Sequence, residues 1–148
     1  MAAFVQVGVP MDNGGVMITR DPYDRENKGA VYISAVWGHN LPVTGGDGEV
    51  KKTVVPEQIL FTPSSNSVQV LTESDQDVMF VPDENGGLKS VPFDKNRRVL
   101  TDAVARNLVR VANNIKRVFG GTEQDIEWGV MNNRVYIIQA RPYIEKKQ

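Results

Sequence analysis

Hydrophobic and polar residues alternate with a period of two in several short runs of the chain, a pattern typical of β-strands. The most regular runs lie near the C-terminus, at residues 124–128 (QDIEW) and 136–142 (YIIQARP), and the stretch MNNR at 131–134 lies between them. Side chains two residues apart share a strand face, so Asp125 pairs with Glu127 on the first strand. Gln139 and Arg141 share a face of the second. The pattern predicts a closing β-hairpin.

The length of the hairpin loop decides whether the two polar pairs meet, because a shift of one residue moves every side chain to the other face. A two-residue loop at 132–133 would pair Met131 with Arg134. In a regular ladder, that register would place the carboxylates and the Gln/Arg pair on opposite faces of the hairpin.

A three-residue loop at 132–134 would instead pair Glu127 with Gln139 and Asp125 with Arg141. The other face would then hold five apolar residues. These are Ile126, Trp128, Tyr136, Ile138 and Ala140. This register separates one polar face from one apolar face, and we therefore predict it.

Shorter strand-like runs precede this hairpin. We expect strands at residues 4–9, 15–19, 30–37, 52–61, 68–71, 78–81 and 88–91. Turn residues at 12–15 (DNGG) predict that the first two strands form a hairpin. Pro56 marks an edge or a break in the fourth strand. The segment 38–48 holds four glycines and the only histidine, and we expect a loop there.

One amphipathic helix is expected before the closing hairpin. Apolar residues recur there at spacings of three and four. They are Val104, Leu108, Val111, Ile115 and Val118. Either Thr101 or Asp102 can cap the start, and the glycines at 120–121 can end the helix. The predicted fold class is α+β, a mostly antiparallel sheet with at least one packed helix, in a single domain over 1–148.

Composition narrows the functional classes. The chain of 148 residues suits one domain with its own core. Its net charge of −1 gives no basic footprint for nucleic acid or an anionic membrane. Cysteine is absent, which excludes disulfides and thiolate chemistry. No apolar run approaches the roughly 20 residues that span a bilayer, and the first residues do not resemble a signal peptide. We therefore expect a cytoplasmic protein.

The polar face of the closing hairpin has two interpretations. Asp125 and Glu127 offer oxygen ligands to Mg²⁺, a hard ion that usually keeps substrate phosphates in its shell. Arg141 can hold a phosphate through its planar guanidinium group. Alternatively, Asp125–Arg141 and Glu127–Gln139 are cross-strand pairs on a solvated face. Spacing alone favours the solvated face, and a metal–phosphate site remains the alternative.

The same residues carry a family resemblance. The two runs of the hairpin resemble the end of the nucleotide-binding domain of the phosphoenolpyruvate synthase and pyruvate phosphate dikinase family, whose pattern is close to Q-D-I-E-W, a short turn, then L-Y-I-L-Q-A-R-P. Upstream, residues 5–9 (VQVGV) are similar to its V-Q-x-M-V strand. Residues 15–22 (GVMITRDP) are similar to its S-G-V-M-F-T-x-D-P segment. The resemblance extends over about residues 4–142.

The resemblance implies the C-terminal half of an ATP-grasp domain, in which two α+β halves hold ATP between them. It implies that Glu127 lies at Mg²⁺ and phosphate, with Asp125 beside it as a second metal ligand. Gln139 would assist at the metal–phosphate site, and Arg141 would contact phosphate. Gln6 would lie at the adenine edge, in a strand that offers backbone groups to the base. The expected ligands are ATP and Mg²⁺.

For the parent protein, the resemblance implies a phosphotransferase that passes a phosphoryl group from ATP, through a carrier histidine in another domain, to pyruvate. The expected partners are an N-terminal ATP-grasp half and the phosphohistidine and pyruvate-binding domains. We expect the 148 residues alone to be inactive and to contain no catalytic residue.

The sequence departs from the family after the third strand. The family continues W-G-L-G-E there, whereas Gly38 is followed by HNLP, so a glycine and an acid are missing. Asp47 and Glu49 are weak substitutes for the acid, and His39 is interpreted as a loop substitution rather than a phosphate carrier. These departures favour an alternative, a non-catalytic module for nucleotide sensing or partner binding that retains the fold.

Overall fold

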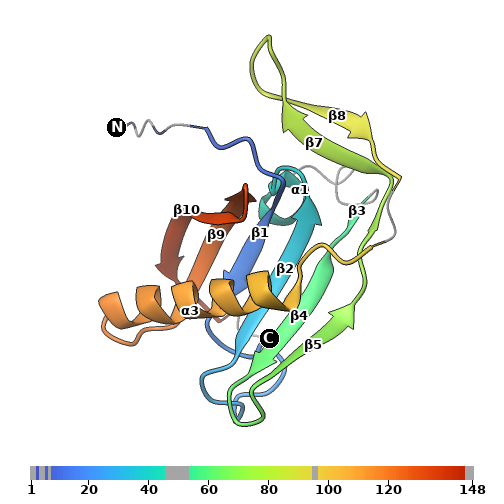
Figure 1. The fold of residues 1–148 in the computed structure, drawn as a ribbon. Helices are drawn as coiled ribbons and strands as arrows, with labels where there is room; N and C mark the ends of the chain where they lie inside the picture. The colour runs from blue at the N-terminus through green and yellow to red at the C-terminus, as the bar shows by residue number, and fades with distance from the viewer. Residues whose placement is uncertain (1–2, 4–5, 7, 46–53, 95–96, 146–148) are drawn as a thin grey trace.

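The chain folds as one six-stranded antiparallel sheet with a long helix across one face (Figure 1). The computed structural model describes residues 3, 6, 8–45, 54–94 and 97–145. The spatial order of the strands is β10-β9-β1-β2-β4-β5. Their bounds are β1 Asn13–Ile18, β2 Val31–Trp37, β4 Glu57–Thr62, β5 Ser67–Thr72, β9 Gln124–Met131 and β10 Arg134–Pro142. The predicted α+β class is confirmed.

Helix α3 (Asp102–Val118) forms where the apolar spacing predicts it. Thr101 is its N-cap, and the Thr101 hydroxyl accepts a hydrogen bond from the backbone N–H of Val104 at 3.3 Å. The helix buries Ala105, Leu108, Val109 and Ala112 against the sheet, whereas Val118, the last residue of the predicted stripe, is 79% exposed. This packing supplies most of the stability of the helix, since helices of this length are marginal alone. The core between them combines both elements. Its largest fully buried members are Trp128, Met17, Ile33, Ile59, Leu100, Leu108 and Ile126.

Smaller elements flank the sheet. β3 (Val54–Val55) pairs with β6 (Asp75–Gln76), and Pro56 separates β3 from β4, as the sequence predicts. β7 (Val78–Pro82) and β8 (Leu88–Pro92) form a hairpin that projects from one end of the sheet (Figure 1). None of the helices that the structure describes is long and apolar enough to cross a membrane.

The predicted N-terminal hairpin is wrong. β1 has β2 on one edge and β9 on the other, so neither edge is left for a strand at residues 4–9. Residues 4, 5 and 7 lie outside the described residues, while Gln6, Gly8 and Val9 are in no strand. The expected loop at 38–48 also contains a one-turn helix, α1 (Leu41–Thr44), in its described part.

The closing hairpin has a two-residue loop, so the predicted three-residue loop is wrong. Met131 pairs with Arg134, and Asn132 and Asn133 have φ angles of 51° and 61°. Two successive residues with positive φ define a type I′ turn, whose twist matches that of the flanking strands and which favours asparagine. The local turn chemistry therefore decided the loop length.

A β-bulge between Ile137 and Gln139 nevertheless restores the predicted pairing, with Glu127 opposite Gln139. The register shifts by one residue at the bulge, and this cancels the shift introduced by the shorter loop. Arg141 consequently lies opposite Asp125. The predicted position of Tyr136 is wrong. Tyr136 pairs with Gly129, which shares a strand face with Glu127, so Tyr136 lies on the polar face rather than the apolar one.

Candidate functional site

The sheet face that points away from α3 carries two rows of side chains, defined by the strand register. We call this surface the open face. One row runs through Gln139, Glu127, Val16, Ser34, Gln58 and Thr72. The next runs through Arg141, Asp125, Ile18, Tyr32, Leu60 and Gln69. The predicted site residues of the hairpin are thus brought together at the β9–β10 end of the open face.

Asp125 and Arg141 form an ion pair across the two strands. The Asp125 Oδ2 atom accepts hydrogen bonds from Arg141 Nη2 at 2.9 Å and Arg141 Nε at 3.0 Å. The Arg141 side chain is 64% exposed and that of Asp125 25% exposed, so solvent screens the pair and its contribution to stability is small. Cross-strand pairing therefore describes this half of the cluster, as the solvated interpretation expects.

Glu127 behaves differently. It is half-buried, and its carboxylate has no hydrogen bond or ion pair with the part of the chain that the structure describes. Burial raises the pKa of Glu127, the neighbouring Asp125 charge raises it further, and Arg141 opposes both. A desolvated carboxylate without a partner is costly, and a bound cation would relieve that cost.

The donor set fits a magnesium ion that shares its shell with a ligand. Glu127 lies opposite Gln139, whose exposed amide offers a second protein oxygen. Among the described residues, no cluster of three or more His, Cys, Asp or Glu side chains is placed to hold a metal. One or two carboxylates completed by waters and phosphate oxygens is the usual way in which proteins hold Mg²⁺.

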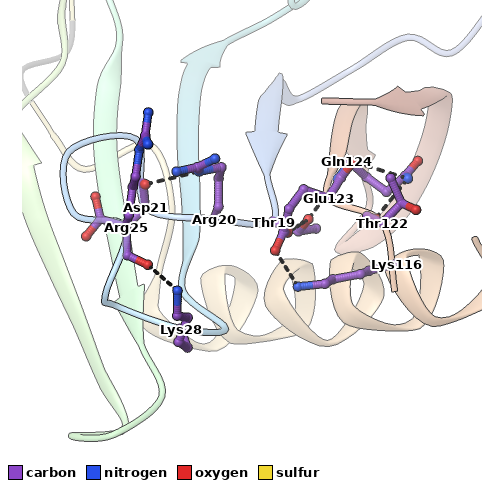
Figure 2. Close-up of polar contacts among 9 residues, drawn as sticks. All are labelled: Thr19, Arg20, Asp21, Arg25, Lys28, Lys116, Thr122, Glu123 and Gln124. Atoms are coloured by element: carbon purple, nitrogen blue, oxygen red, sulfur yellow. Dashed lines mark hydrogen bonds and ion pairs between the residues drawn. The ribbon is translucent and has the colours of Figure 1, made fainter. Parts of the chain in front are cut away.

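A polar network anchors the strand that carries the carboxylates (Figure 2). The Thr19 hydroxyl donates to Glu123 Oε2 at 2.5 Å and accepts from the backbone N–H of Gln124 at 2.8 Å. Lys116 of α3 donates to Glu123 Oε1 at 2.7 Å. The end of β1, the start of β9 and the last turn of α3 are therefore tied together immediately before Asp125. Sequence reasoning missed these residues, since no periodic pattern connects them.

The altered stretch after Gly38, which follows the end of β2, has a structural role. Asn40 is 3% exposed, and its amide donates to the Gly15 carbonyl at 3.5 Å. His39 is half-buried, its Nδ1 accepts from the Leu41 backbone N–H at 3.2 Å, and burial lowers its pKa. Asp47 and Glu49, the weak substitutes for the missing acid, lie outside the described residues.

The remaining predicted residues lie away from this cluster. Gln6 is exposed in an irregular segment before β1, and its expected place at an adenine edge stays a prediction. Trp128 is fully buried in the core. The ring of Trp37 lies under the Arg97 guanidinium, 4.4 Å from its centroid, and beside Phe93. Both tryptophans are packing residues.

A mostly antiparallel sheet covered by a helix on one face, with carboxylates and an arginine on its open face, defines the class as an α+β domain. The family comparison is more specific. The chain belongs to the family described as pyruvate phosphate dikinase, AMP/ATP-binding domain, whose model matches residues 1–148. The resemblance in the closing hairpin is therefore confirmed.

Similar curated proteins are much longer than this chain. A probable phosphoenolpyruvate synthase of Methanocaldococcus jannaschii is 32% identical over 151 aligned residues, which cover 100% of this chain and 12% of that protein. A second one, from Methanothermobacter thermautotrophicus, is 28% identical over 96% of this chain and 20% of its own length. A rifampicin phosphotransferase of Streptomyces sviceus is 29% identical over 96% of this chain and 16% of its own length. The chain thus spans a fifth or less of each.

Proposed function

We propose that the chain binds Mg-ATP on its open face, as the C-terminal half of an ATP-grasp domain in a phosphotransferase. The observation that carries the proposal is the half-buried Glu127 carboxylate, which has no partner among the described residues yet lies beside Gln139 and within the field of Arg141. A solvated cross-strand pair would need no such desolvated acid. The membership in an AMP/ATP-binding family supports the same reading.

Each side chain has a distinct part in this proposal. Glu127 and Gln139 supply oxygen atoms to Mg²⁺, and the nucleotide phosphates and water complete the shell. Arg141 binds a phosphate through guanidinium N–H groups that its ion pair leaves free. Asp125 lies beside them, and the family resemblance implies that it is a second metal ligand, a role that its ion pair with Arg141 makes less favourable. When bound, the ion neutralises phosphate charge and orients the nucleotide.

For the parent protein, we propose transfer of the ATP phosphoryl group to pyruvate by way of a carrier histidine in another domain. The names of the phosphoenolpyruvate synthase relatives support pyruvate as the acceptor, whereas the rifampicin phosphotransferases point to an antibiotic. The open face covers the nucleotide from one side only. The opposite side therefore requires a second subdomain that supplies further cations, and the 148 residues alone are expected to give no turnover.

A non-catalytic module is the second candidate. Asn40 and Leu41 occupy the positions where the family pattern has a glycine and an acid, and Asn40 is buried against β1. A site that lost one acid can retain nucleotide binding and lose phosphoryl transfer. Turnover by the whole parent protein separates the two candidates, since the module would bind Mg-ATP without consuming it.

The test is calorimetric titration of Mg-ATP into the protein that carries this chain. The Mg-ATP affinities of the E127Q and E84Q variants are compared with that of the wild type. Glu84 is an exposed acid at the β7–β8 turn and serves as the matched control. We expect E127Q to weaken Mg-ATP binding by about tenfold or more, as the loss of a metal-binding group does, and E84Q to change nothing. Equal binding by wild type and E127Q would refute the proposed site.

A further inference from the structure

One carboxylate oxygen of Asp125 holds the Arg141 guanidinium, although most of the Arg141 side chain is exposed to solvent. Its Nε and Nη2 both donate to Asp125 Oδ2, at 3.0 and 2.9 Å, while 64% of the side chain is exposed. Packing cannot orient a side chain that is so exposed, so its direction is set by the ion pair. A free arginine samples many rotamers and loses that freedom when it binds a ligand.

The geometry of the pair leaves the other edge of the guanidinium available. A guanidinium has five N–H donors in a rigid plane. Asp125 uses the Nε–H and one Nη2–H, so both Nη1 hydrogens and the second Nη2–H remain for another acceptor. The Nη1/Nη2 edge matches the spacing of two oxygens of a phosphate group. Arg141 can therefore keep Asp125 and bind an anion at the same time.

Asp125 is also poorly suited to compete for a cation. Its Oδ2 already accepts two charge-assisted hydrogen bonds from Arg141, whereas Glu127 on the same strand has a carboxylate without partners among the described residues. A cation at Oδ2 would face the positive guanidinium at hydrogen-bond distance. The two acids of the hairpin thus have different environments, which favours different roles.

We propose that Asp125 is a positioning residue, which orders Arg141 for a nucleotide phosphate and does not ligate the metal. This assignment rests on the proposed Mg-ATP site. The assignment predicts that D125N lowers the affinity for the nucleotide, although the loss of a negative charge alone would raise it. Removing the Asp125 charge would by itself lessen the repulsion of a phosphate anion, so a loss of nucleotide affinity in D125N that depends on Arg141 must come from losing the orientation of Arg141.

A double-mutant cycle tests the assignment in the protein that carries this chain. Mg-ATP affinity is measured for D125N, R141K and the double variant D125N/R141K, since lysine keeps the charge but lacks the planar fork. We expect D125N to weaken binding about tenfold in the wild type, the usual scale for a residue that orients a ligand group. In the R141K background, D125N is expected to leave binding unchanged or tighter. A loss of the same size in both backgrounds would show that Asp125 acts on the metal or on Glu127, and would overturn the assignment.

An NMR measurement reads the ion pair without nucleotide or metal. The Arg141 Nε–H signal, assigned by its disappearance in R141K, should be protected from exchange in the wild type and lose that protection in D125N. D102N is the matched control, because Asp102, the first residue of α3, forms a similar exposed pair with Arg98 at 2.7 Å. Unchanged protection in D125N would overturn the positioning role. If instead E127Q leaves Mg-ATP binding intact, the proposed function fails and this assignment fails with it.

Discussion

Gly15 is the position where a single methyl group should disturb the sheet most. It lies in the middle of β1, between Ala35 of β2 and Trp128 of β9, on the face covered by α3. A Cβ atom built on Gly15 would lie 1.9 Å from the Ser34 carbonyl oxygen and 2.8 Å from Trp128 Cζ2. The ring of Trp128, the residue after Glu127, thus packs against Gly15 in a space that a larger residue at position 15 would fill.

The cost of Gly15→Ala follows from these distances. A relaxed carbon–oxygen contact is about 3.3 Å, so β1 and β2 must separate locally by roughly 1.4 Å. That displacement takes neighbouring ladder hydrogen bonds beyond their normal range. Two or three weakened bonds at about 1 kcal/mol each, with overpacking against Trp128, give a loss of about 3 to 5 kcal/mol. Such a loss is a large part of the total stability of a domain, which is about 5 to 15 kcal/mol.

The assay is urea denaturation of the chain, followed by the fluorescence of its tryptophans. Gly8→Ala is the control, because a Cβ there has nothing within 4 Å, and the change should stay within about 0.5 kcal/mol. Gly14→Ala should fall between them, since its nearest contact is the movable Met11 side chain at 2.8 Å. A Gly15→Ala variant as stable as Gly8→Ala would refute the close packing of β1 against β2.

Three further outcomes can be measured in the same way. Thr101→Ala removes the N-cap of α3 and should cost about 1 kcal/mol in urea denaturation. Glu57→Ala should cost about 2 to 5 kcal/mol, because its buried carboxylate accepts two backbone N–H groups, at 3.0 and 3.1 Å, that would be left unpaired; a milder loss would mean that water reaches them. Glu127→Gln should stabilise the chain at neutral pH. The raised pKa of Glu127 makes its ionised form costly in the folded state, so the difference should vanish as the pH falls below the pKa of the unfolded chain. A constant difference at all pH values would contradict that origin.

The helix and the central strands could be predicted because their signals are local. The apolar stripe of α3 and the β-branched run of β2 each report burial of one face, and burial decides the element. The N-terminal hairpin failed for a non-local reason. The residues before β1 have a strand-like sequence, but a hairpin with β1 needs a free edge of β1. That edge pairs with β9, which lies more than a hundred residues further along the chain.

The candidate site was predicted by a partly wrong argument. The pairing of Glu127 with Gln139 came from separating polar and apolar faces, and that criterion was sound. The loop length used to reach it was wrong, because Asn132 and Asn133 favour a two-residue turn and the bulge supplied the missing shift. The different environments of Asp125 and Glu127 could not be read from their spacing, since they depend on where the Arg141 side chain lies.

The bulge at Ile138 also makes the hairpin tolerant of length variation. One extra residue in β10 is already accommodated there, so a relative that lacks it could form an unbroken ladder with the same partners opposite each other. The interval between the acidic motif on β9 and the glutamine–arginine motif on β10 is therefore free to differ by one residue while the cluster stays intact. A search that requires a fixed interval between the two motifs would overlook such relatives, and one that allows a single-residue gap before the glutamine would recover them.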